Sequence, residues 1–470
     1  MSYAAALSSL HARSGELYAP PGQPRRKFRL EDMRTLVDAL GHPERRFRSV
    51  LIAGTNGKGS TAATLAAILH VAGIRTGLYT SPHLIRVNER IRIAGAPISD
   101  DDFARYYFRV DDTANRLVTE GRLPGPPSFF EALTALAFEA FAEARVEIAV
   151  LEVGMGGRLD ATNVVDPLLS VITDVSLDHM EWLGDTVALI AREKAGILRP
   201  NGILVTLPQH PEANQSIGEV AVDLNVRAIN AADYIPFGPP APDTPDPGAP
   251  PLPAVARYGL RNRYPLTVLG KTISVDSPLY GAHQRRNLAL AIAAAVEIRN
   301  HYGYTITPAA IEAGIRATEW PGRLELFALS TVPSALQPVL LDVAHNPAGA
   351  WTLRAALSSL TPESVPRIAV FGCLRDKAIA EMAQILFPLF GRVIVTPVAS
   401  PRAATVDELL AAAAQTGTPA VSAPDPVAAL DRALAEVPPG GLIVVAGSVY
   451  LIGEIRQRLL ALGAAVVHNP

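Results

Sequence analysis

The sequence predicts an α/β protein of two domains, each built on a mostly parallel sheet covered by helices. Short runs of β-branched and aliphatic residues alternate with Ala- and Leu-rich stretches, which is the pattern of strands and helices in such folds. The clearest predicted strands are 47–55, 147–154, 168–175 and 202–208, and after a break 338–347, 367–373, 392–398 and 441–448. The break and the length of 470 residues favour more than one domain.

The break between the two strand series has three parts. Residues 236–256 are so rich in Pro that neither a helix nor a central strand is expected there, and an exposed loop is predicted. Residues 266–284 read as short strands and 285–300 as an Ala-rich helix, and the second series begins after Pro321. We therefore place a first domain at 1–310 and a smaller second domain at 321–470.

Composition limits the class of protein. Hydrophobic residues make up 49% and charged residues 19% of the chain, and the formal net charge is −3. Nothing in this balance indicates nucleic acid or an anionic membrane as a partner. The single Cys373 fits a reducing compartment, the N-terminus lacks the pattern of a signal peptide, and no apolar run reaches the roughly 20 residues that a bilayer needs. A cytoplasmic protein is expected.

One stretch, VLIAGTNGKGSTAATL at 50–65, predicts an anion site. A strand that leads through a Gly-rich turn into a helix directs backbone N–H groups and the positive end of the helix dipole at a ligand. Lys58 is expected to neutralise phosphate charge and Ser60 to ligate Mg²⁺. The spacing departs from G-x-x-x-x-G-K-[ST], so the turn alone also allows a Gly-rich connection with a surface lysine.

Three further groups lie at strand ends, where open α/β sheets bind ligands. They are Ser81, Glu152, and the segment 173–197, in which Asp178 and His179 precede a helix that carries Lys194. Asp185 is the expected N-cap of that helix, and Gly196 is its expected end. Each residue has an ordinary alternative, such as a Ser-Pro turn, a solvated glutamate or a hydrogen-bonded histidine. Together they favour a site that binds Mg²⁺ through few protein oxygens.

Several motifs resemble, in order and spacing, those of folylpolyglutamate synthase and dihydrofolate synthase, members of the Mur ligase superfamily. They are GTNGKGS, TSPHLIRVNERI, EVGMGGRLDATN, DHMEWLGDTVALIAREKAGI, GAHQRRN, WPGRLE and DVAHNP, and the similarity spans roughly residues 25–460. The resemblance implies a P-loop-type parallel-sheet ATP-binding domain and a smaller Rossmann-like C-terminal domain. It also implies an ATP-dependent ligase that adds L-glutamate to dihydropteroate or to the γ-carboxylate of a reduced folate, through an acyl phosphate.

The same resemblance implies roles for individual residues. Those expected to bind ATP are Thr55, Asn56, Gly57, Lys58, Gly59, Ser60, Asn287, Arg323 and Asp342. Two Mg²⁺ ions are expected, with Ser81 and Glu152 as ligands of one and His179 as a ligand of the other. Ser60 and, when carboxylated, Lys194 are further expected metal ligands. Lys58, Lys194 and His345 are the expected catalytic residues, with His345 near the glutamate site. The pterin pocket is expected at Ser128, Phe129, Phe130, Glu131, Leu159, Asp160 and Ala161.

Alternatives remain at this stage. Phe129 and Phe130 fit core packing at the start of an amphipathic helix as well as a pterin pocket. The chain also fits another Mur-type ligase that acts on a cell-wall precursor, a nucleotide-binding regulator with a decayed site, or a generic phosphotransferase. From the resemblance we expect a monomer whose partners are the small-molecule substrates.

Overall fold

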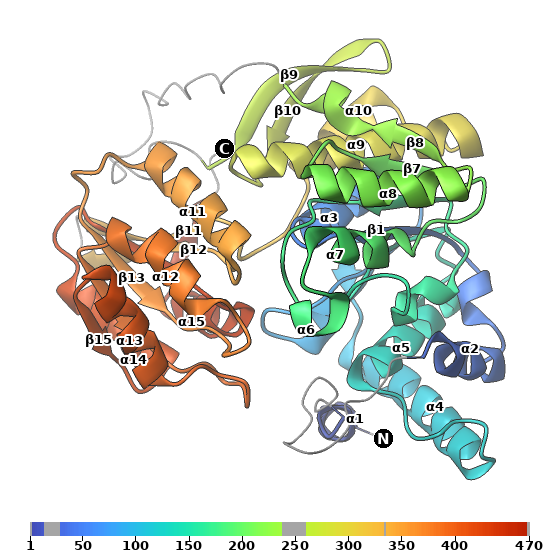
Figure 1. The fold of residues 1–470 in the computed structure, drawn as a ribbon, viewed down its shortest axis with the longest axis horizontal. Coiled ribbons are helices and arrows are strands. Elements are labelled where there is room, and N and C mark those ends of the chain that lie inside the picture. The colour runs from blue at the N-terminus through green and yellow to red at the C-terminus, as the bar shows by residue number, and fades with distance from the viewer. Residues whose placement is uncertain (1, 14–28, 237–259, 333–334, 468–470) are drawn as a thin grey trace. The chain divides into compact units, whose positions relative to one another are not determined.

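The computed structural model describes residues 2–13, 29–236, 260–332 and 335–467, and these form two compact units (Figure 1). Unit 1 comprises residues 1–236, 265–273 and 286–318, and unit 2 comprises 237–264, 274–285 and 319–470. Most of the predicted Pro-rich loop, from residue 237 onwards, lies outside the described residues. The predicted boundary between 310 and 321 stays a prediction.

The apolar strands of unit 1 form an eight-stranded sheet in the order β4-β3-β2-β5-β1-β6-β7-β8. The strands from β2 to β8 in this order pair in parallel, and β3 and β4 add an antiparallel edge. Parallel strands covered on both faces read as continuous apolar runs, which is why β1 and β5 are almost wholly buried. The bounds are β1 Arg48–Ala53, β2 Thr76–Tyr79, β3 Ile91–Ile93, β4 Ala96–Pro97, β5 Ile148–Glu152, β6 Leu169–Ile172, β7 Ile203–Thr206 and β8 Arg227–Asn230.

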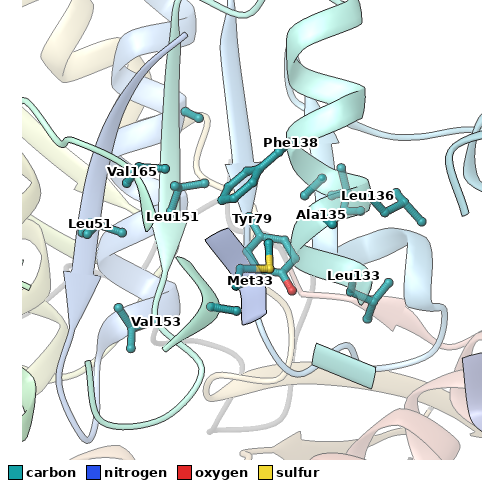
Figure 2. Packing of buried hydrophobic residues seen from close by; sticks show 14 of the residues in the cluster. Met33, Leu51, Tyr79, Leu133, Ala135, Leu136, Phe138, Leu151, Val153 and Val165 are labelled. Carbon is teal, nitrogen blue, oxygen red and sulfur yellow. The ribbon is translucent and has the colours of Figure 1, made fainter. Parts of the chain in front are cut away.

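Helices cover this sheet and build its core. The core includes Met33, Leu51, Tyr79, Phe138 and Leu151, so that α2 and α5 pack with the strands (Figure 2). The helices up to the end of unit 1 are α1 Tyr3–His11, α2 Leu30–Ala39, α3 Lys58–Val71, α4 Asp100–Thr119, α5 Phe129–Glu143, α6 Met180–Leu183, α7 Val187–Ala195, α8 Pro211–Asp223, α9 Ala282–Tyr302 and α10 Pro308–Arg316. Short 3-10 turns lie at Pro43–Arg45, Val87–Arg90, Ala161–Val164 and Ala231–Tyr234. A two-stranded sheet, β9 Asn262–Val268 and β10 Lys271–Ser277, precedes α9.

Unit 2 contains a seven-stranded sheet in the order β15-β14-β13-β16-β12-β11-β17. The strands from β15 to β12 pair in parallel, and β11 pairs in antiparallel fashion with both β12 and β17. Its strands are β11 Glu325–Val332, β12 Ala335–Leu341, β13 Arg367–Phe371, β14 Arg392–Val395, β15 Ala420–Ser422, β16 Leu442–Ala446 and β17 Ala465–Val466. Its helices are α11 Pro347–Leu360, α12 Ile379–Leu386, α13 Val406–Thr416, α14 Pro426–Glu436 and α15 Val449–Ala461, with a 3-10 turn at Phe387–Leu389.

The predicted two-domain α/β fold is confirmed, and one local prediction is wrong. All eight predicted strands form, and the helix predicted at 285–300 lies within α9. Asp185 does not cap α7, because the hydroxyl of Thr186 accepts the N–H of Leu189 instead. Within the described residues, no helix is long and apolar enough to cross a membrane.

Candidate active site

Four loops of unit 1 meet at the carboxyl edge of the parallel sheet. Ile52 in β1 pairs with Glu152 at the end of β5, and Ala53 pairs with Ile172 at the end of β6. Strand β2 ends at Tyr79, which pairs with Leu151. The register therefore places the turn after β1, the Ser81 segment, Glu152 and residues 173–179 beside one another, as expected for a ligand site in an open α/β sheet.

Two glycines let the turn after β1 pack against its neighbours. A Cβ at Gly54, where φ is +153°, would lie 1.7 Å from Oγ1 of Thr173. A Cβ at Gly57, where φ is +88°, would lie 2.2 Å from Oδ1 of Asn287. Only glycine fits such close approaches at positive φ. Asn287, predicted to bind ATP, therefore lies directly against this turn.

Main-chain and threonine hydroxyl groups hydrogen-bond the turn to the segment after β6. The N–H groups of Thr55 and Asn56 donate to the carbonyl of Asp174, at 2.8 and 3.3 Å. The Thr55 hydroxyl donates to the Ser176 carbonyl at 3.0 Å, and the Thr173 hydroxyl donates to the Asn56 carbonyl at 2.8 Å. An incoming phosphate would therefore meet the N–H groups that follow, from Gly57 into the first turn of α3.

The N-terminus of α3 faces the same edge and carries the predicted phosphate ligands. Helix α3 begins at Lys58, and its first intrahelical bond runs from the Thr61 N–H to the Gly57 carbonyl. The N–H groups before Thr61 have no acceptor within the helix, as at any helix start, and can bind an anion. Lys58 Nζ lies 3.2 Å from the Thr55 carbonyl, folded over the turn, and Ser60 is buried in the first helical turn.

Ser81 and Glu152, which are predicted to share one metal ion, lie in contact. The Ser81 N–H donates to Oε2 of Glu152 at 3.0 Å, and the glutamate side chain is buried. The bond orients the carboxylate beside the serine, which gives hard oxygen donors of the kind that Mg²⁺ prefers. In the described parts of the chain, no three His, Cys, Asp or Glu side chains gather so that they could hold a metal ion.

His179 stands at the start of the short helix α6 in the left-handed region, with φ of +52°. Its N–H donates to Oδ1 of Asp178 at 2.9 Å. The same Asp178 lies close enough to Lys194 to act on its pKa. His179, which is predicted to hold the second metal ion, thus lies next to a carboxylate that also acts on Lys194 in α7.

Lys194 is a buried amine beside the turn that follows β1, residues 54–57, which we call the phosphate turn. Its side chain is in the last turn of α7, and Nζ donates to the Gly54 carbonyl at 2.8 Å. Burial and the positive charge of Lys58 lower the pKa of Lys194 from 10.5 to about 7, against the opposing charges of Asp178 and Asp160. A substantial fraction of this amine is therefore neutral and nucleophilic near neutral pH.

The first segment predicted to line the pterin pocket, residues 128–131, lies at the start of α5. Hydrogen bonds within the segment fix its conformation. Ser128 caps the helix by accepting the Glu131 N–H at 3.2 Å, and Glu131 accepts the Ser128 N–H at 2.8 Å. This is a capping box, and both residues are buried. The Phe130 ring lies 5.8 Å from the Tyr79 ring and leaves no room for a Cβ at Gly154.

The neighbouring Phe129 is partly exposed and lies among cationic and aromatic groups. Its ring is parallel to that of His11, with centroids 6.3 Å apart, and the Arg90 guanidinium lies 5.1 Å from its centroid. Arg90 donates from Nε to Nδ1 of His83 at 2.9 Å. Burial and the charge of Arg90 lower the pKa of His83 to about 3, so this imidazole is the neutral acceptor. Phe129 and Phe130 are both partly exposed, so neither ring is fully buried in the core.

The second segment predicted to line the pterin pocket, residues 159–161, is a tight turn. Asp160 Oδ2 accepts the N–H groups of Gly154 and Met155, both at 3.0 Å, and Oδ1 accepts from Thr162. Burial raises the pKa of Asp160, against these hydrogen bonds. Ala161 is buried, whereas Leu159 is exposed. The segment therefore offers an apolar side chain to a ligand rather than a carboxylate.

The three predicted residues of unit 2 lie around the end of β12. Asp342 accepts the N–H groups of Leu324 and Ala344, both at 2.9 Å. Burial raises the pKa of Asp342, whereas the positive charge of Arg323 opposes this. His345 Nδ1 lies 2.9 Å from the Val343 carbonyl, just before α11 begins. The Arg323 guanidinium is thus close enough to Asp342 to favour its charged form.

Sequence reasoning missed residues that hold these loops together. Thr173 and Asp174 fix the phosphate turn, and the Arg286 guanidinium grips both carboxylate oxygens of Asp174 at 2.6 to 3.2 Å. Asp174 lies near the end of the predicted strand 168–175, and Arg286 precedes Asn287. Asp174 and Arg286 lie in the motifs that carry the predicted site residues, and this position was the signal in the sequence that could have identified them.

Comparison with known proteins defines the class and then the family. Residues 322–449 match the domain described as Mur ligase, glutamate ligase domain. Together with the phosphate turn of unit 1, this defines an ATP-dependent ligase of the Mur type. The dihydrofolate synthase/folylpolyglutamate synthase of Bacillus subtilis is 34% identical over 91% of this chain and 94% of its own length. The chain belongs to the folylpolyglutamate synthase/dihydrofolate synthase family.

Further relatives agree with this assignment. The folylpolyglutamate synthase of Lacticaseibacillus casei is 35% identical over 91% of this chain and 93% of its own length. A crystal structure of Mycobacterium tuberculosis folylpolyglutamate synthase complexed with ADP and AMPPCP has a TM-score of 0.82 at 32% identity, covering 99% of this chain and 100% of the other. An Escherichia coli structure complexed with DHPP and ADP has a TM-score of 0.78 at 28% identity, covering 98% of each chain.

Proposed function

We propose that this ligase joins L-glutamate to dihydropteroate and to the γ-carboxylate of reduced folyl-glutamates. The observation that carries the proposal is the assembly at one sheet edge of the phosphate turn, the Ser81–Glu152 pair and the buried Lys194 amine. The names of the relatives, which include both synthase activities, support the choice of acceptors over a cell-wall precursor.

The chemistry requires activation of a carboxylate, because a carboxylate and an amine do not condense readily in water. The acceptor carboxylate oxygen attacks the γ-phosphorus of ATP, the bond to the bridging oxygen breaks, and ADP leaves. The glutamate amine then attacks the acyl carbon, and the tetrahedral intermediate expels phosphate and loses a proton. Lys58 and the first N–H groups of α3 offset the negative charge on the phosphates in the first step.

Two Mg²⁺ ions are part of this proposal. Ser60, Ser81 and Glu152 would hold one ion, and the hydrogen-bonded carboxylate supports this role because it is a preoriented oxygen donor. His179 would hold the other with Lys194, whose neutral amine can take up CO₂ to become an anionic oxygen ligand. When bound, such ions neutralise phosphate charge and polarise the transferred group.

The remaining predicted residues complete the proposal. Asn287, Arg323 and Asp342 would contact ATP, and His345 would serve the glutamate step. The acceptor would lie against segments 128–131 and 159–161, through main-chain groups, Phe129 and Leu159, because Ser128, Glu131 and Asp160 already form internal bonds. We propose a cytoplasmic monomer that binds no nucleic acid.

The test is phosphate release from ATP with Mg²⁺ and L-glutamate, with dihydropteroate in one tube and tetrahydrofolate in another. Mass spectrometry checks each product for one added glutamate. Product in both tubes is expected, product in one assigns a single activity, and product only with a UDP-linked acceptor would overturn the proposal. Lys58→Ala and Glu152→Ala should abolish turnover, while Lys271→Ala, an exposed lysine on β10, should not change it.

A further inference from the structure

Asn163 is a buried amide that lies between two main-chain segments. Its Nδ2 donates to the carbonyls of Arg158 and Gly196, both at 3.1 Å, and its Oδ1 accepts from Nη2 of Arg199 at 2.9 Å. Only 5% of the residue is exposed. Both amide protons and the amide oxygen are thus used, which is the condition for a buried polar group to stabilise one arrangement.

The two segments that Asn163 bridges are the turn at 157–163 and the end of α7. They also meet directly, because the Arg158 N–H donates to the Glu193 carbonyl at 2.9 Å. A Cβ at Gly157 would lie 2.9 Å from the carbonyl oxygens of both Glu193 and Lys194, so the backbones are in close contact. The last turn of α7 is therefore seated on the 157–163 turn.

Lys194 is in this last turn of α7, and its side chain extends to the phosphate turn. Nζ donates to the Gly54 carbonyl in the phosphate turn at 2.8 Å. The amine is thereby placed by two fixed ends, the Gly54 carbonyl and the main chain around residues 193–196. Helix α7 ends at Ala195; the Arg158 N–H holds its last turn at the Glu193 carbonyl, and Asn163 holds the residue that follows the helix at the Gly196 carbonyl.

The ion pair between Arg158 and Glu193 lies at the same junction, but it is half exposed and is therefore less suited to hold the end of α7 in place. Arg158 donates from Nε and Nη2 to Oε1 of Glu193, each at 3.0 Å, but 56% of the arginine side chain is exposed. Exposed pairs contribute little, whereas a buried donor cannot be lost without leaving carbonyls unsatisfied. Asn163 is the buried and saturated member of the junction.

We infer that Asn163 is a positioning residue for Lys194, which it holds at the phosphate site by clamping the end of α7 to the turn at 157–163. The inference rests on the proposed role of Lys194 in ligation. Asn163 itself need touch neither ATP nor the acceptor. Reactions of this kind are sensitive to displacements of about 1 Å, so loosening the clamp should affect turnover more than nucleotide binding.

The test compares Asn163→Asp, which keeps the shape but removes both donors, with wild-type protein. We expect kcat to fall at least tenfold while the affinity for AMPPCP stays within threefold. The concentration of bicarbonate that gives half-maximal activity should rise at least tenfold, and the ¹³C NMR signal of a lysine carbamate in ¹³CO₂ buffer should weaken. A purely structural loss would lower the amount of folded enzyme without shifting the bicarbonate response.

Asn225→Asp is the matched control, because Asn225 Nδ2 donates to Oδ1 of Asn201 on the surface at 2.9 Å. It should leave every readout unchanged. If Asn163→Asp does not fold, Asn163→Ala removes the same donors without adding a buried charge and should shift the bicarbonate response in the same direction. A folded Asn163→Asp with wild-type kcat and bicarbonate response would overturn the inference. If the wild-type protein ligates glutamate without any carbamate signal, the proposed carboxylation of Lys194 is overturned. In that case an unchanged kcat in Asn163→Asp would still refute the positioning role of Asn163.

Discussion

Lys194→Met should make the protein more stable and inactive. Lowering the pKa of the lysine from 10.5 to about 7 means that burial disfavours its ammonium form. The unfolded chain holds this proton up to about pH 10.5 and the folded chain only to about pH 7, so the penalty is complete below pH 7 and disappears as pH rises to 10.5. The penalty is roughly 5 kcal/mol at pH 6 and roughly 2 kcal/mol at pH 9.

Methionine carries no such penalty but loses one hydrogen bond. The unpaired Gly54 carbonyl offsets about 1–3 kcal/mol of the gain. The net gain in the free energy of unfolding is therefore roughly 2–4 kcal/mol at pH 6 and close to zero at pH 9. For a unit of this size, the midpoint of thermal unfolding should rise by roughly 4–8 °C at pH 6.

The assay is thermal unfolding in CO₂-free and magnesium-free buffer at pH 6 and pH 9, followed by circular dichroism. Lys271→Met, at an exposed position, should show no such shift at either pH. A Lys194→Met variant no more stable than wild type at pH 6 would refute the reasoning. So would a gain that is the same at both pH values.

Three further outcomes are expected. Gly57→Ala should weaken ADP binding at least tenfold in calorimetry, because its Cβ would displace Asn287 at a positive φ; an unchanged Kd would contradict this. Ser128→Ala should lower the free energy of unfolding by about 1 kcal/mol, since the hydroxyl caps α5, and leave the KM for the acceptor within twofold; a tenfold higher KM would show that the hydroxyl binds the acceptor. Chelation with EDTA should stop phosphate release, and added Mg²⁺ should restore it in wild type but not in Glu152→Ala.

Strands were the most predictable part of the fold. Buried parallel strands carry continuous β-branched runs, so β1, β5 and β16 stand out from the sequence without any contact information. Helix ends depend on single hydrogen bonds and are harder to predict. Asp185 and Thr186 are both good N-caps, and only the backbone conformation, extended at Thr186, decides between them.

The sequence indicated the strand ends at which candidate residues lie: Glu152 is the last residue of β5, and Ser81 lies two residues after β2. Ser81 and Glu152 meet because β2 and β5 are neighbours, which the order of strands in the sequence does not reveal. Asn163 was not predictable, because its partners are main-chain carbonyls at residues 158 and 196. Main-chain groups are present at every residue, so sequence carries no mark of which of them a buried amide will reach.

The bonds between the phosphate turn and the Asp174 carbonyl have a thermodynamic consequence. Thr55 and Asn56 are already fixed by the protein, so nucleotide binding need not pay for ordering them. Product release, in turn, need not dismantle the turn. Because amides held in this way exchange with solvent only when the structure opens, their hydrogen exchange should be as slow in the free enzyme as with ADP bound.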